Sequence, residues 1–194
     1  FTHIDLIKFN SMLAKVQKEI KTIRSLIEII GQLEAFIAVA SYREALPFYC
    51  RGDLMEEKGT VLEAKDMYHP LVEEPVANSI YENRPVLITG SNASGKSTFL
   101  KTTAICAILA QTVDTVPAHS YHANFFRVYS SMALKDNLQG NESYYMVEIR
   151  SLKRIMDAEK EEGASVLCFV DEVLRGTNTV ERIAASSRIL QSLA

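Results

Sequence analysis

One short segment combines glycine, lysine and serine at a spacing suited to holding phosphate. Residues 90–98 read GSNASGKST and fit G-x-x-x-x-G-K-[ST] through Gly90, Gly95, Lys96 and Ser97. Glycines let the backbone wrap so that amide N–H groups point at phosphate oxygens, and a helix that starts here would add its positive N-terminus. We expect Lys96 to bridge the β- and γ-phosphates of ATP and Ser97 to ligate Mg²⁺. The predicted nucleotide-contacting residues of this loop are Gly90, Ser91, Asn92, Ala93, Ser94, Gly95, Lys96, Ser97 and Thr98.

A second segment supplies the acidic groups that such a loop requires. Residues 166–172 read VLCFVDE, an expected buried strand that ends in two carboxylates. Ligands bind at the carboxyl ends of strands in α/β sheets, so we expect both carboxylates near the phosphate loop. We predict that Asp171 completes the Mg²⁺ shell through water, and that Glu172 orients or deprotonates the attacking water. A water-activating glutamate beside the magnesium aspartate favours ATP hydrolysis over phosphate transfer to a small acceptor.

Short apolar strands that alternate with helices would position these groups. Strands are expected near residues 61–64, 84–89, 125–130 and 166–170, and helices near residues 96–112, 145–161 and 179–194. This alternation predicts an α/β fold, a P-loop NTPase with a mainly parallel central sheet.

A long helix is expected before this domain, over residues 4–46. Its apolar residues alternate spacings of three and four, as in a heptad seam: Leu6, Phe9, Leu13, Val16, Ile20, Ile23, Ile27 and Ile30. Two interpretations stay open, a helix that packs along a domain or a lever arm that transmits motion. We therefore expect a helical lever or clamp end over residues 1–52 and a P-loop ATPase domain, truncated at its C-terminus, over residues 53–194.

The composition limits the other classes of function. Hydrophobic residues make up 47% and charged residues 23% of the 194 residues, as in ordinary globular domains. A net charge of −3 gives no basic surface for nucleic acid, so any DNA is expected to bind through domains outside this chain. Cys50, Cys106 and Cys168 lack metal-ligand spacing and suit a cytoplasmic location. No apolar run approaches the length of a bilayer span, so we expect no membrane contact.

Four ordered segments resemble the ATPase domain of the MutS mismatch-repair family. They read GSNASGKSTFLKT, ILAQTVDTVPA, DNLQGNESYYMVE and VDEVLRGTNT, and the resemblance runs from about Leu33 to the end of the chain. It implies an ABC-type ATPase fold that binds and hydrolyses ATP. It also implies that this activity drives conformational change in a protein that repairs DNA or binds DNA structures. The full-length protein would form a homodimer with composite ATP sites.

The resemblance assigns further residues to that composite site. Ser143 aligns with the signature serine, which reaches the nucleotide of the partner subunit, and Glu148 aligns with the glutamate of the same segment. Asn92 aligns with a loop asparagine close to the γ-phosphate. The stretch that touches adenine corresponds to Val76, Ala77 and Asn78, and the dimer-interface loop to Arg175, Gly176, Thr177 and Thr179. From the residues alone, an alternative role for Ser143 is a helix N-cap, and for Arg175 an ordinary surface position.

Several positions depart from the family pattern. The family loop has Pro, Met and Gly where this chain has Ser91, Ala93 and Ser94. Tyrosines follow Ser143 in place of Thr-Phe, and Pro75 stands where an aromatic residue is frequent. These differences indicate a divergent MutS-like branch.

Two alternative functions stay open at this stage. One is another ABC-type ATPase, although the Leu-Ser-Gly-Gly signature of the transporter type does not occur in the sequence. The other is a nucleotide-sensing module with little hydrolysis and no role in mismatch repair. A nucleotide-binding assay beside a steady-state ATPase assay would separate a sensor from an enzyme.

Overall fold

The computed structural model describes residues 3–57, 59–132, 144–171, 173 and 178–193. By its internal contacts the chain divides into two compact units, Phe1–Ala45 and Leu46–Ala194.

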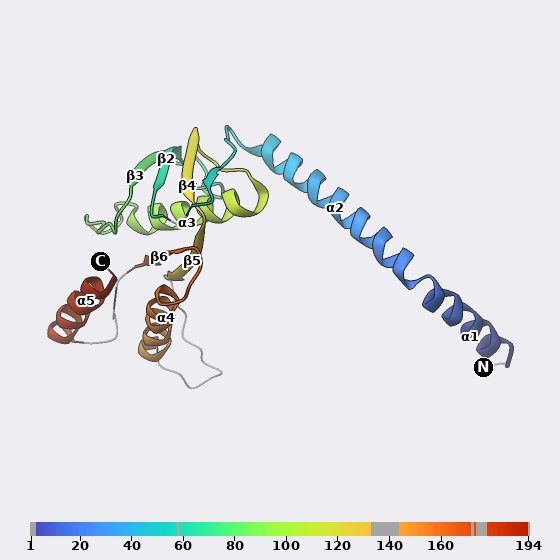
Figure 1. The fold of residues 1–194 in the computed structure, drawn as a ribbon. Coiled ribbons are helices and arrows are strands. Elements are labelled where there is room, and N and C mark those ends of the chain that lie inside the picture. The colour runs from blue at the N-terminus through green and yellow to red at the C-terminus, as the bar shows by residue number, and fades with distance from the viewer. Residues whose placement is uncertain (1–2, 58, 133–143, 172, 174–177, 194) are drawn as a thin grey trace. The chain divides into compact units, whose positions relative to one another are not determined.

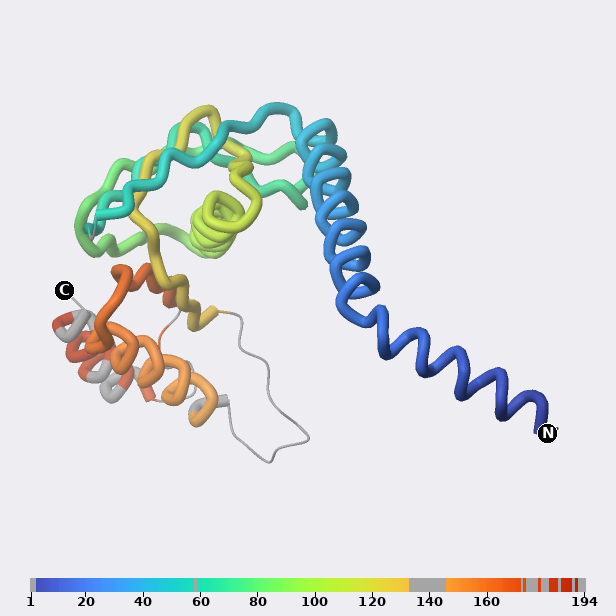
Figure 2. The backbone as a smooth tube through the Cα atoms, turned by 45° about the vertical axis from the view of Figure 1, so that its right-hand side comes forward, coloured from blue at the N-terminus to red at the C-terminus, as the bar shows by residue number. Residues whose placement is uncertain are grey.

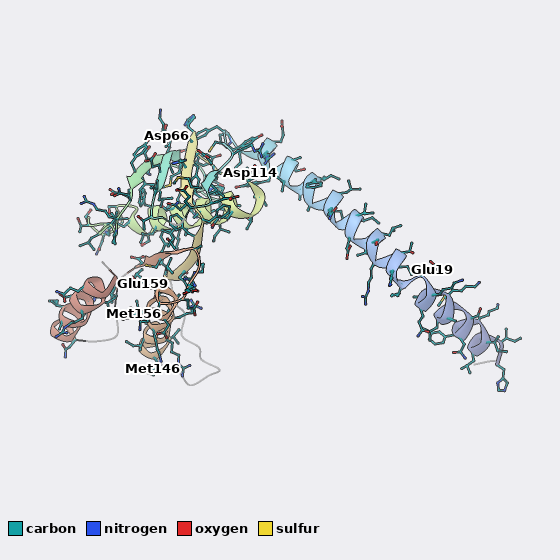
Figure 3. The ribbon with its side chains drawn as sticks, in the orientation of Figure 1. Glu19, Asp66, Asp114, Met146, Met156 and Glu159 are labelled. Atoms are coloured by element: carbon teal, nitrogen blue, oxygen red, sulfur yellow. The ribbon has the colours of Figure 1, made fainter. Side chains whose placement is uncertain are left out.

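The first unit contains two helices, α1 (His3–Lys18) and α2 (Ile20–Ala45) (Figures 1 and 2). The sequence predicted one helix over residues 4–46, and the break falls at Glu19, which is labelled in Figure 3. No described residue of either helix is buried. The apolar seam, including Phe9, is therefore exposed within this chain.

The larger sheet of the second unit has the strand order β1-β4-β2-β3. Its strands are β1 (Asp53–Met55), β2 (Leu62–Met67), β3 (Asn78–Glu82) and β4 (Ser120–Asn124). The β1–β4 pair is parallel, whereas β4–β2 and β2–β3 are antiparallel. β2 and β3 run in opposite directions because no helix lies between them to carry the chain back across the sheet. This sheet is therefore mixed.

Helix α3 (Lys96–Val113) covers one face of this sheet, and Figure 2 shows it nearly end-on. Alternate residues of β2 are buried, as expected for a strand with one face on the core. Cys106 and Ala110 of α3 belong to the same buried cluster as Leu62 and Tyr121. The core thus fixes the helix that follows the glycine-rich loop.

A second sheet pairs β5 (Phe126–Ser131) with β6 (Ser165–Val170) in parallel. Helix α4 (Tyr144–Glu159) makes the crossover and packs against both strands, with Ile155 fully buried. Helix α5 (Thr179–Leu193) ends the described chain. This sheet brings the predicted acidic strand, β6, beside β5.

The predicted fold class is wrong for this chain. An ABC-type P-loop fold requires a mainly parallel central sheet, whereas two of the three pairings in the larger sheet are antiparallel. The described elements are a mixed sheet, a separate parallel pair and five helices. The connection from β2 to β3 contains no helix and favours an antiparallel pair, and alternation of apolar runs along the sequence did not reveal this pairing.

The strand predicted at residues 84–89 is also wrong. Residues 85–90 have no regular secondary structure, and Val86 and Leu87 are 49% and 70% exposed. A short apolar run needs a paired neighbour to become a strand. The loop at residues 90–98 is thus preceded by largely exposed chain without regular secondary structure. As for membranes, none of the described helices is both long and apolar enough to span one.

Candidate functional site

The glycine-rich loop leads directly into α3. Gly95 occupies the N-cap position with φ 88°, a left-handed conformation that glycine adopts without strain, and no side chain caps the helix there. The first N–H groups of a helix have no partner inside the helix. With the helix dipole, they make the start of α3 suited to an anion such as phosphate.

The loop is tightly folded around its first glycine. A Cβ atom on Gly90 would lie 3.0 Å from Ser94 Oγ, which is closer than real Cβ contacts normally allow. Ala93 has φ 60°, a left-handed conformation that costs a non-glycine residue about 1–2 kcal/mol. Strained backbone of this kind persists only where the surrounding structure enforces it, and it clusters at functional sites.

Lys96 folds back over its own loop. Its Nζ atom donates hydrogen bonds to the carbonyl oxygens of Gly90 at 2.8 Å and Ser91 at 2.5 Å. The ammonium charge therefore lies over the loop. The two carbonyls were not predicted as partners, although the spacing of five or six residues from Lys96 could have suggested them.

The structure brings Ser97 and Asp171 together. Ser97 Oγ donates a 2.5 Å hydrogen bond to Asp171 Oδ2, across 74 residues of sequence. Asp171 directly follows β6, and its backbone N–H donates to the carbonyl of Ser131 at 3.2 Å. The carboxylate thus lies where the parallel pair ends, as predicted from the sequence. Its hydrogen bond is of the strong, charge-assisted kind.

Ser97 and Asp171 suit a divalent cation such as Mg²⁺, which prefers hydroxyl and carboxylate oxygens. Among the described residues, no group of three or more His, Cys, Asp or Glu could hold a metal ion. A cation at this pair would therefore take its remaining ligands from phosphate oxygens and water, which is usual for Mg²⁺ in nucleotide sites.

Several predicted site residues lie outside the described part of the chain. They are Ser143, Glu172, Arg175, Gly176 and Thr177. Glu148 is described, and it is only 2% exposed on α4. Its burial was not expected from the sequence.

The predicted adenine contacts lie before the loop. Val76 is 81% exposed, and Asn78 begins β3 opposite Met67. The Asn78 side chain donates a 3.0 Å hydrogen bond to the Val76 carbonyl. This bond orients the amide, so that the Asn78 side-chain nitrogen faces its own segment.

Arg127 on β5 is a positioning residue that the sequence did not reveal. Its guanidinium donates to the carbonyls of Ala158 at 2.7 Å, Ala164 at 3.0 Å and Glu161 at 3.2 Å, and to Glu161 Oε2 at 2.8 Å. These groups lie at and after the C-terminal end of α4, where carbonyls lack helix partners. Arg127 thus fastens the turn from α4 into β6, the strand that carries Asp171.

The cysteines of the chain are free thiols. Burial raises the pKa of the Cys106 thiol to about 12, with a smaller contribution from Cys50. Burial also raises the pKa values of Cys50 and Cys168. Protonated thiols are poor nucleophiles and poor metal ligands, and the buried Cys106 acts as a small core side chain.

Comparison with known proteins identifies relatives of the whole segment. The MutS domain V family matches residues 86–194, which is more than half of the chain. The DNA mismatch repair protein MutS of Thermus aquaticus is 33% identical over 184 residues, with 92% of this chain and 22% of the relative covered. MutS protein homolog 4 of Mus musculus is 29% identical over 223 residues, with 100% and 22% covered. DNA mismatch repair protein MSH3 of Debaryomyces hansenii is 26% identical over 197 residues, with 95% and 19% covered. The chain thus spans about a fifth of the length of these relatives.

Proposed function

The chain belongs to the MutS family, and from that premise we propose that its loop at residues 90–98 binds ATP with Mg²⁺. The proposal rests on the loop, its following helix and the carboxylate at the end of β6. It does not require a mainly parallel central sheet. It extends to hydrolysis of the bound ATP, in the service of DNA mismatch repair or of another task on DNA.

The hydrogen bond between Ser97 and Asp171 carries the proposal. A hydroxyl at the start of the loop helix and a carboxylate at a strand end serve together in nucleotide sites, as the two protein ligands near Mg²⁺. Without a metal, the hydroxyl proton can bridge the two oxygens directly. The two oxygens lie 2.5 Å apart, so a small separation would let both contact one cation.

The loop supplies the groups that would hold the phosphates. The N–H groups at the start of α3 would donate to phosphate oxygens. Lys96 would give up its hydrogen bonds to the loop carbonyls and donate to the β- and γ-phosphates instead. Mg²⁺, once bound, would neutralise part of the phosphate charge. Val76 and Asn78 would lie along the adenine ring.

Hydrolysis requires a group that orients water, and we assign this role to Glu172. It directly follows Asp171 in the sequence. A carboxylate at this position would hold a water molecule in line with the γ-phosphate and accept its proton. In the full-length protein, Ser143 of a second subunit would contact the same phosphate, which makes the site a shared one between two copies. DNA would bind through parts of the protein outside this chain.

A nucleotide titration tests the binding step. Lys96→Ala should weaken binding of ATP with Mg²⁺ by at least about a hundredfold, because a charge-assisted contact to two phosphates is lost. Lys101→Ala is the matched control, since it removes an exposed lysine from the same helix, and it should bind as the unchanged chain does. Tight binding of ATP by Lys96→Ala would contradict the assignment of residues 90–98 as the ATP-binding loop.

Turnover is tested in the full-length protein. Glu172→Gln should bind ATP normally but hydrolyse it at least about a hundredfold more slowly, within the range of one general base. Mixing Ser143→Ala with Lys96→Ala subunits should restore part of the activity, because one of the two mixed sites is then intact. Normal turnover by Glu172→Gln would remove its role, and binding without turnover in the unchanged protein would identify a nucleotide sensor.

A further inference from the structure

The far end of α3 is fastened to the segment that follows α2. Helix α3 ends at Val113, and Asp114, labelled in Figure 3, caps it in a left-handed conformation with φ 48°. Asp114 Oδ1 accepts a 3.0 Å hydrogen bond from the Gly52 backbone N–H, and Oδ2 accepts a 2.5 Å hydrogen bond from Arg51 Nε. One carboxylate therefore holds two consecutive residues.

An aspartate is an unexpected residue at this position. Glycine and asparagine are the residues that adopt the left-handed cap most readily, and a negative charge at a helix C-terminus opposes the helix dipole. Asp114 has both disadvantages. The two hydrogen bonds that its carboxylate accepts explain why an aspartate is found here.

The hydrogen bond to Gly52 matters more than the ion pair. The Arg51 and Asp114 side chains are 80% and 38% exposed, and exposed pairs contribute little to stability. The Gly52 N–H is part-buried, and a Cβ atom on Gly52 would lie 3.1 Å from Ala110 Cβ. Here the chain passes close to the last turns of α3, and a side chain at position 52 would require Ala110 to shift by a few tenths of an ångström.

Further contacts hold the same segment. Cys50 and Val116 exchange two backbone hydrogen bonds of 2.9 Å. The Phe48 ring stacks on His119 with centroids 4.0 Å apart, and Tyr68 Oη donates to the Phe48 carbonyl at 2.7 Å. Residues 48–52 are thus fixed at several points and do not form a loose linker.

The buried face of α3 has little side-chain bulk. Its buried residues are all small: Thr102, Thr103, Ala104, Cys106, Ala107 and Ala110. Small sliding of packed helices is a known mode of conformational change, and small side chains offer little interlocking to resist it. A shift at the N-terminal end of such a helix would appear at its C-terminal end.

We propose that Asp114 couples nucleotide binding at the start of α3 to the position of residues 48–52, into which the chain passes after α2. This inference rests on the proposed nucleotide site. Phosphate drawn onto the N-terminus of α3 moves or steadies the helix, and the Asp114 carboxylate passes that change to Gly52. By linkage, a fastened Gly52 also favours nucleotide binding.

Two substitutions at Asp114 separate the carboxylate's role from that of the backbone. Asp114→Gly keeps the left-handed cap without strain but removes the acceptor, whereas Asp114→Asn keeps both the cap and an acceptor oxygen for Gly52. Hydrogen exchange of the Gly52 amide is measured in the full chain, with and without the ATP analogue AMP-PNP and Mg²⁺. Asp157→Ala, which removes an exposed carboxylate from α4, is the control.

In the unchanged chain, Asp114→Asn and Asp157→Ala, we expect AMP-PNP to slow Gly52 exchange by about fivefold or more, within the range of allosteric couplings. In Asp114→Gly, exchange should be fast in both conditions, and AMP-PNP should bind about fivefold more weakly. If AMP-PNP binds the unchanged chain but leaves its Gly52 exchange rate the same, the coupling is refuted and the nucleotide site is not. Equally tight binding of AMP-PNP to Asp114→Gly and to the unchanged chain would have the same meaning. If AMP-PNP does not bind the unchanged chain, the proposed nucleotide site fails and the coupling fails with it.

Discussion

Ser97 Oγ lies 2.5 Å from Asp171 Oδ2, although Ser97 begins the loop helix and Asp171 follows a strand 74 residues later. The larger sheet contributes neither residue. Two parts of the second unit therefore meet at this pair, α3 on one side and the β5–β6 pair on the other.

Removal of either member of the pair should abolish the metal-dependent part of nucleotide binding. We expect Ser97→Ala and Asp171→Asn each to weaken ATP binding about tenfold or more with Mg²⁺, and to have little effect with EDTA. Isothermal titration under both conditions measures this difference. The double substitution should add little to either single one, because both remove the same cation. Ser187→Ala, an exposed serine on α5, is the control, and equal losses with and without Mg²⁺ would contradict a shared cation.

The left-handed conformation of Ala93 should be measurable as strain. Ala93→Gly should raise the free energy of unfolding by up to about 1 kcal/mol, because glycine adopts φ 60° without a Cβ clash. Ala184→Gly is the matched control on α5, where the same change should lower stability by about 1 kcal/mol. Urea unfolding compares the two variants. A destabilised Ala93→Gly would mean that the loop does not keep this conformation in solution.

Arg127 should be required for the stability of the α4–β6 turn. Arg127→Ala leaves three carbonyls and one carboxylate without their donor, and we expect a loss of about 2–4 kcal/mol. Arg127→Lys should recover only part of this loss, since an ammonium cannot reproduce the planar fork. Thermal or urea unfolding provides the measurement. Arg84→Ala, whose side chain is 81% exposed, should change stability by less than about 0.5 kcal/mol.

Buried Cys106 should make stability fall at alkaline pH. Burial raises the pKa of its thiol from 9.0 to about 12, so the folded chain keeps a proton that the unfolded chain loses. The contribution of this protonated thiol to the free energy of unfolding is fully present below pH 9. It is lost as pH rises toward 12, at about 1.4 kcal/mol per pH unit.

Urea unfolding between pH 9 and 11 checks this slope. Cys106→Ala should flatten it by that amount, whereas Cys168→Ala should flatten it less because Cys168 is only half-buried. Identical slopes for the unchanged chain and Cys106→Ala would show that the thiol ionises normally in the fold.

Local patterns in the sequence were enough to predict most helices and the position of the loop before α3. The 3.6-residue periodicity predicted α3 and α4 to within a few residues, and the GKS spacing placed Lys96 and Ser97 on the first turn of α3. These features depend on neighbours in the sequence, so the residues alone determine them. The carboxylate at the end of β6 was predicted in the same way, from five apolar residues followed by Asp171.

Only the tertiary structure decided the direction and partners of the strands. The short strands β1, β3 and β4 were missed, and the run at residues 84–89 was wrongly predicted as a strand. Strand pairing depends on residues far away in the sequence, such as Glu63 of β2 opposite His122 of β4, and an apolar run cannot specify its partner. The same holds for the contacts of Arg127 and Asp114. The residues alone therefore determined which groups could do the chemistry, and long-range packing decided that Ser97 and Asp171 meet within a mixed architecture.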